Sequence, residues 1–101
     1  MQHRLEFHEI LCEILGSRNV YFQPPASIAI QYPCILYMIK SKKPEFANDF
    51  KYQLRDCYDV IYVDRDPDSD VPDRISDLEL SAFDRHYIAD NLHHSVYSVY
   101  F

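Results

Sequence analysis

Four aspartates stand at every second position of one short segment, which is the carboxylate spacing of calcium-binding loops. They are Asp64, Asp66, Asp68 and Asp70. Such a loop also needs a glycine at its sixth position for a sharp turn and a bidentate glutamate at its twelfth. Counted from Asp66, those positions hold Val71 and Asp77. The segment therefore predicts a solvated acidic loop, and we expect no metal site in it.

Histidine and cysteine residues could also carry chemistry, but their spacing predicts no complete centre. His86 and His93 could face each other across a hairpin and supply two zinc ligands, yet no third ligand is spaced to join them. The cysteines are far apart and form no CxxC pair, so we expect three reduced thiols in a cytosolic protein. They are Cys12, Cys34 and Cys57. A Cys–His nucleophile pair stays open, because such partners meet in space, but no motif of catalytic cysteines surrounds any of the three. We expect no enzyme activity and no cofactor.

The composition is that of one acidic globular domain covering residues 1–101. Hydrophobic residues make up 48% of the chain and charged residues 26%, and the formal net charge is −6. Specific nucleic-acid binding is not expected, because it needs a basic footprint. The longest uncharged run, Asn19 to Ile39, contains three prolines and polar glutamines, so it predicts no spanning helix and no membrane partner.

Hydrophobic periodicity predicts an α+β fold in the order helix, three strands, helix, two strands. The first helix carries an apolar stripe and ends at Gly16, the only glycine. The stripe consists of Phe7, Ile10, Leu11, Ile14 and Leu15. A second, short helix is expected from Pro72 to near Leu80. Strands are expected over 20–22, 34–39, the second half of 52–63, 83–89 and 93–101, with 41–49 as a loop or hairpin arm and 90–91 as a tight turn. Both helices should pack on one mainly antiparallel sheet of about five strands.

Aromatic residues gather on the predicted strands, which indicates either a thin core or a subunit interface. The chain contains nine Tyr and six Phe, and these residue types suit both environments. Nearly every strand is apolar on both faces, whereas two helices cover only one face of a sheet. We therefore expect assembly, with the edge strand that ends at the two prolines as the contact. Its residues are Val20, Tyr21, Phe22, Pro24 and Pro25.

Four stretches of the sequence carry a family resemblance. They are residues 14–25, 32–35, 63–69 and 83–92, and they span almost the whole chain. Together they resemble small tail-completion proteins of long-tailed bacteriophages and prophages, of the tail-terminator and head–tail joining kind. The length and the order of the elements are similar to that class. The family implies no catalytic residues, so none are assigned.

The resemblance implies a structural protein that closes the upper end of the tail tube as a homo-oligomeric ring, hexameric like the tube. Its implied partners are further copies of itself, the tail tube protein, and the head connector or neck proteins. Its implied place is the head–tail junction of the virion, reached by assembly in the host cytoplasm. We expect the acidic segment from Asp64 to Asp70 to face the ring lumen or the docking side, since negative charge in a lumen keeps DNA from sticking.

Two alternatives to a tail terminator remain open at this point. A head–tail joining or minor capsid protein would occupy a different place in the same virion. A small cytosolic enzyme or metal-binding domain would belong to another class and would use His86, His93 or the acidic loop.

Overall fold

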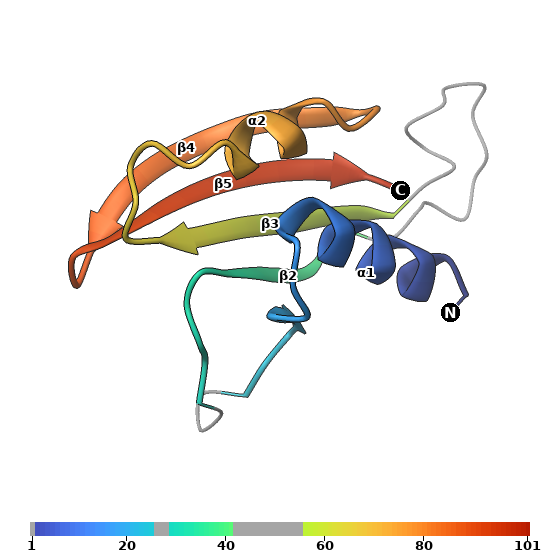
Figure 1. The fold of residues 1–101 in the computed structure, drawn as a ribbon. Helices are drawn as coiled ribbons and strands as arrows, with labels where there is room; N and C mark the ends of the chain where they lie inside the picture. The colour runs from blue at the N-terminus through green and yellow to red at the C-terminus, as the bar shows by residue number, and fades with distance from the viewer. Residues whose placement is uncertain (1, 26–28, 42–55) are drawn as a thin grey trace.

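The computed structural model describes residues 2–25, 29–41 and 56–101, and these residues form an α+β fold with the predicted order of elements (Figure 1). The helices are α1 (Gln2–Leu15) and α2 (Val71–Ser76). The strands are β1 (Val20–Phe22), β2 (Cys34–Ser41), β3 (Cys57–Asp64), β4 (Ser81–Ala89) and β5 (Leu92–Tyr100). The predicted fold class is confirmed.

One five-stranded sheet, in the order β1-β2-β3-β5-β4, forms the framework of the molecule. Only the β1–β2 pair is parallel, and the other three pairs are antiparallel. Both helices lie against the same face of the sheet, α1 over β1 and β2 and α2 over β4 and β5 (Figure 1). The sheet therefore ends in two different edge strands, β1 and β4.

Helix α1 buries the centre of its predicted stripe and ends where the glycine predicts. Phe7 and Leu11 are fully buried, and Ile14 and Leu15 pack partly buried against the core. Gly16 has φ +80°, and its amide donates to the Cys12 carbonyl at 2.8 Å. A side chain at this glycine would meet no atom within 4 Å, so the positive φ rather than lack of space favours glycine here.

Aromatic side chains fill the layer between α1 and the sheet. The Phe7 ring lies 5.6 Å from that of Tyr37, 4.9 Å from that of Tyr58 and 5.0 Å from that of Phe101, measured between centroids. The core explanation thus holds for these rings. It does not hold for Phe83, which is 59% exposed.

The later elements match the predicted ones with small differences in their ends. The two-residue turn is confirmed, because Asp90 and Asn91 have φ values of 53° and 63°, as a tight hairpin requires. Helix α2 stops at Ser76 rather than near Leu80, since Leu78 donates its amide to the Ile75 carbonyl in a tightened last turn. The predicted segment 41–49 lies outside the described residues beyond its first position, as do residues 52–55 of the predicted third strand.

A polar cluster under α1 makes the stability of the fold sensitive to pH. The Tyr37 hydroxyl accepts a hydrogen bond from Arg4 Nη1 at 3.1 Å and lies 2.7 Å from Nδ1 of His8. Partial burial, and then the nearby Arg4 charge, lower the pKa of His8 below its ordinary value of 6.5. Below pH 6.5 the unfolded chain therefore binds a proton at His8 more readily than the folded chain does, which destabilises the fold as pH falls.

Replacing His8 by asparagine should make stability less dependent on pH. The shorter amide side chain would keep a polar group near Tyr37 and would not titrate, whereas the wild type should lose stability as pH falls from 7.5 to 5.5. Urea midpoints of both proteins across this range measure the effect, and the other histidines cancel in the difference. Parallel curves for the two proteins would show that His8 does not contribute.

Candidate functional site

The acidic segment is a connector between β3 and α2 that is organised by its own side chains. Asp64 accepts hydrogen bonds from the Tyr62 hydroxyl and, at 3.1 Å, from the Asp66 amide. Asp66 in turn accepts one from the Asp68 amide at 2.9 Å, and Asp70 pairs with Arg74 at 2.9 Å. Partial burial, and then the bond to Asp64, raise the pKa of Tyr62.

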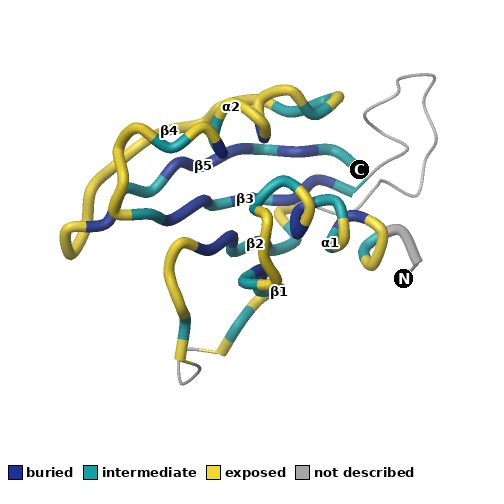
Figure 2. The backbone as a smooth tube through the Cα atoms, in the orientation of Figure 1, coloured by how far each residue is buried: buried dark blue, intermediate teal, exposed yellow. Residues whose placement is uncertain are grey.

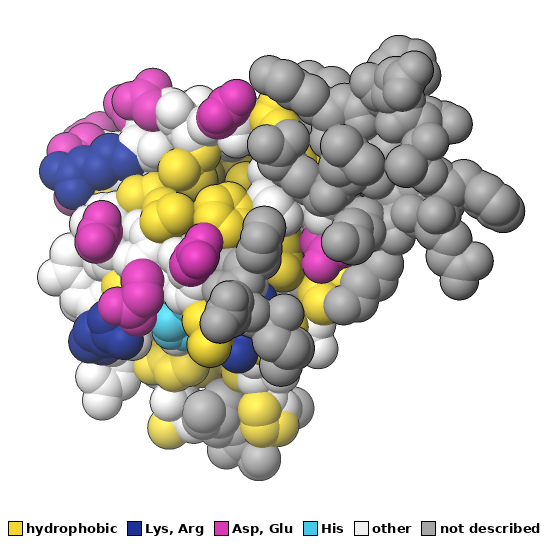
Figure 3. Space-filling view, turned by 90° about the vertical axis from the view of Figure 1, so that its right-hand side faces the viewer, with side chains coloured by type: hydrophobic (Ala, Val, Ile, Leu, Met, Phe, Trp, Pro, Cys, Tyr) yellow, Lys and Arg dark blue, Asp and Glu magenta, His cyan; other side chains and the backbone are white. Residues whose placement is uncertain are grey.

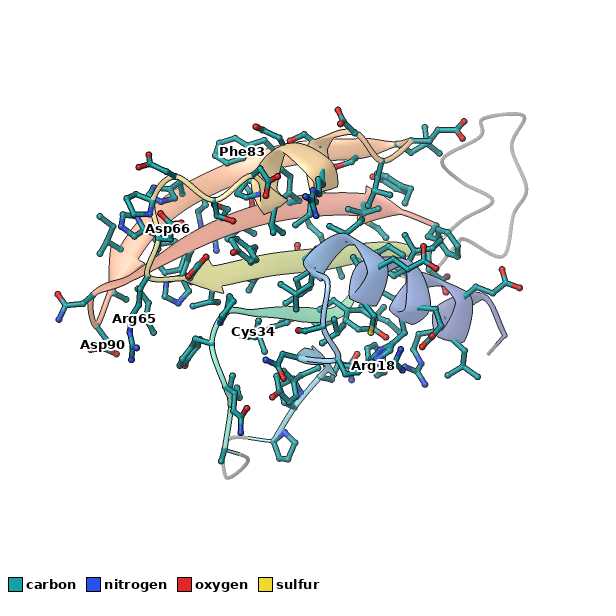
Figure 4. All side chains as sticks on the ribbon, viewed as in Figure 1. Arg18, Cys34, Arg65, Asp66, Phe83 and Asp90 are labelled. Carbon is teal, nitrogen blue, oxygen red and sulfur yellow. The ribbon has the colours of Figure 1, made fainter. Side chains whose placement is uncertain are left out.

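The exposure of the four predicted aspartates divides them into two groups. Asp66, Asp68 and Asp70 are exposed, whereas Asp64 is half-buried at the end of β3. Two of the carboxylates hold successive turns of the connector, as short aspartate side chains do in loops. The exposed three lie on the connector that passes beside the β4–β5 hairpin, where Figure 4 labels Asp66 and its neighbour Arg65.

His86 and His93 come together across the hairpin, on the same face as the helices. The register sets His86 opposite Ser95 and His93 opposite Ile88, so the two histidines are diagonal neighbours. Their rings stack with centroids 5.3 Å apart, and His93 Nδ1 lies 3.3 Å from His86 Nε2.

A cleft of about 290 Å³ lies between these histidines and the acidic connector. Its lining includes Tyr62, Asp66, Ser69, Asp73, His86 and His93. Within the described ranges, no three histidine, cysteine, aspartate or glutamate side chains are placed to hold a metal ion together. The structure thus brings the two predicted histidines together without giving them a third ligand from the residues it describes.

The three cysteines are buried and free, and none of them lines this cleft. Cys12 is on α1, Cys34 begins β2 and Cys57 begins β3. Burial raises the pKa of the Cys12 thiol, and it raises that of Cys34 to about 12. A raised pKa keeps a thiol protonated at neutral pH, which disfavours nucleophilic attack.

Strand β1, the predicted contact, is an edge strand whose side chains are largely committed to the fold. Val20 is buried in the main core, and the half-buried Phe22 lies beneath the Arg4 guanidinium, 4.4 Å from its ring centroid. Tyr21 points to the opposite face, where it joins a smaller apolar cluster around Cys34. Pro24 is half-buried and Pro25 exposed just beyond the strand.

The free backbone groups of β1 can still be assigned. Gln23 donates its amide to the Tyr37 carbonyl at 2.9 Å, so its peptide group faces β2. Because peptide groups alternate along a strand, those of Val20 and Phe22 point to the open side. The edge that the sequence predicts is therefore present, but a partner would contact mainly its peptide groups and not its side chains.

Strand β4 is the more exposed of the two edges, which its sequence alone does not indicate. Eight of its nine residues are exposed (Figure 2). They include Phe83, Tyr87 and Ile88, which are 59%, 38% and 62% exposed. A long edge that pairs with no further strand among the described residues, and that carries exposed apolar side chains, is a template for strand pairing. Its apolar residues were visible in the sequence, but its position at the edge depends on the strand order.

An apolar hollow of about 200 Å³ opens near the C-terminus, between α1, the segment that follows α2, and β5. Its lining includes Phe7, Leu78, Leu80, Val99 and Phe101. Figure 3, which views this end of the molecule, shows hydrophobic side chains with acidic side chains around them. Glu79 and Tyr100 also line the hollow.

No helix within the described residues is long and apolar enough to cross a membrane. Comparisons of the chain with protein-family models, with curated proteins and with solved structures found no match.

Proposed function

We propose that this chain is a tail-completion protein of a long-tailed phage or prophage that caps the tail tube as a ring and joins it to the head. The observation that carries the proposal is the pair of unlike edges, β1 and β4, at opposite ends of one sheet. A closed ring of identical subunits needs two different surfaces on each subunit, which meet head to tail. The two edges supply such a pair, and the function remains structural rather than enzymatic.

In this ring, β1 of one subunit lies beside β4 of the next and extends the sheet across the contact. Val20 and Phe22 contribute peptide groups, while their side chains stay in the core of their own subunit. The apolar side chains at the contact come from β4, chiefly Phe83 and Ile88. The proposed contact thus keeps the predicted edge strand β1 and adds β4 as its partner surface.

The exposed aspartates of the connector serve the lumen or the docking side of the proposed ring. Replacing Asp66, Asp68 and Asp70 by asparagine should leave the fold intact, because asparagine can still accept the turn-forming hydrogen bonds. The loss of negative charge should impair head or tail joining, or raise non-specific affinity for DNA. Assembly assays and DNA-binding titrations measure both effects, with Asp64 left unchanged so that its bond to Tyr62 is kept. If the variant joins heads and tails normally and gains no affinity for DNA, the segment is only a solvated loop.

Co-sedimentation with preformed tail tubes tests the proposed function. A tail tube protein from the same phage or prophage is polymerised, mixed with the protein and pelleted. A tail terminator should pellet in a small, saturable amount set by the number of tube ends. Binding to the head connector without binding to tubes would favour the head–tail joining alternative, and binding to neither would remove a role at the virion joint.

A further inference from the structure

The free peptide groups of β4 follow from the hydrogen bonds of its neighbour β5. Tyr100 donates its amide to the Leu80 carbonyl at 3.1 Å, and Phe101 donates its amide to the Asp56 carbonyl at 3.0 Å. The peptide groups of even-numbered β5 residues therefore point toward β4, and those of odd-numbered residues point toward β3. Each β4 residue that pairs with an odd-numbered β5 residue directs its own peptide groups to the open edge.

A bulge interrupts this alternation in the middle of β4. Phe83 pairs with Tyr97 and Arg85 pairs with the adjacent Val96, so Asp84 is the extra residue. The residues with outward peptide groups are Ser81, Phe83, His86 and Ile88. Their spacing is two residues on each side of the bulge and three residues across it.

A regular partner strand, with a spacing of two throughout, can match this edge on only one side of the bulge. A second β4 running antiparallel has the same spacing and can match it on both sides. We propose that β4 pairs antiparallel with β4 of a second copy of this chain, with Ser81 opposite Ile88 of that copy and Phe83 opposite its His86. The twofold axis passes between Asp84 and Arg85, and all helices lie on one face of the joined sheet.

The side chains favour this register. Asp84 of each copy stands opposite Arg85 of the other, so the contact contains two opposite-charge pairs related by symmetry. Both side chains are exposed, at 39% and 61%, and their pairing within one chain leaves them accessible. The chain as a whole is acidic, but β4 contains one aspartate and one arginine. The charges on this strand therefore balance, and two copies of it do not repel each other.

The pairing also covers apolar surface that the single chain leaves in water. Phe83 and Ile88 are the most exposed of the large hydrophobic side chains in the described residues, and both lie on this edge. On the opposite face, Ala82 would stand beside Tyr87 of the second copy. An uncovered sheet edge with exposed apolar side chains favours aggregation, and symmetric pairing covers that edge.

This inference concerns the free protein and does not rest on the proposed function. The twofold contact and the ring contact both use β4, so they exclude each other. The dimer would keep the edge covered until another surface competes for it.

Charge reversal tests the register. Arg85→Asp places two carboxylates opposite each other at both symmetric positions and should weaken the dimer about tenfold or more. Adding Asp84→Arg restores opposite charges and should bring the dissociation constant back toward that of the wild type. Sedimentation velocity over a range of concentrations measures all three proteins. A monomeric wild type, or a double variant as weak as the single one, would overturn the proposal.

Disulfide trapping tests the same register without relying on charge. Ala82→Cys/Tyr87→Cys places cysteines opposite each other across the contact, at positions with close side chains, and should give a covalent dimer on mild oxidation. Ala82→Cys/Ala89→Cys puts the second cysteine out of register and should stay mostly uncrosslinked. The native cysteines are buried and do not compete. Equal cross-linking of the two variants would contradict the register, while tube binding measured on the wild type reports on the ring independently.

Discussion

Replacing Leu11 by alanine is expected to lower the free energy of unfolding by about 2–5 kcal/mol. Leu11 is fully buried between α1 and the sheet, where the change removes apolar contacts and leaves a cavity. Small domains are stable by only about 5–15 kcal/mol, so this is a large share of the total. Chemical denaturation followed by far-UV circular dichroism measures the loss.

Leu5 provides a matched control on the same helix. It is 53% exposed, so Leu5→Ala should change stability by no more than about 0.5 kcal/mol. Similar denaturation midpoints for Leu11→Ala and the wild type would show that α1 does not pack as described.

Replacing Phe83 and Ile88 by lysine is expected to abolish both tube capping and self-association while the fold is kept. Both side chains are exposed on β4, and lysine on an edge strand is a charge that natural sheets use to block strand pairing. The double variant should therefore unfold at nearly the wild-type midpoint. Tube co-sedimentation and sedimentation velocity measure the two losses.

A second double variant controls for the added charge. Leu5→Lys/Ser76→Lys adds the same number of lysines at exposed positions on the helices instead of on an edge strand. It should cap tubes normally. Capping by the β4 variant that equals capping by this control would exclude β4 as an assembly surface.

Local sequence signals were sufficient for the elements of this fold. The apolar stripe around Leu11 and the lone Gly16 defined α1, and the Asp90-Asn91 pair defined the last hairpin. These features are local, because periodicity and turn preference depend on neighbours in the sequence. The same hairpin predicted that His86 and His93 lie close together.

Features that depend on distant pairing could not be predicted in this way. The insertion of β5 between β3 and β4 makes β4 an edge, and nothing within residues 81–89 indicates which side of the strand is free. The bulge at Asp84 is likewise visible only in the register with β5. The partial burial of Phe22 depends on its packing against Tyr37, which is distant in the sequence.

Electron microscopy of growing tail tubes tests the central claim most directly. Tube protein is polymerised with and without this protein, and negatively stained tubes are measured for length and inspected at their ends. The proposed function predicts that the protein stops elongation and that each stopped tube carries a ring at one end. Tubes that continue to grow with bare ends, at protein concentrations well above that of the ends, would contradict it.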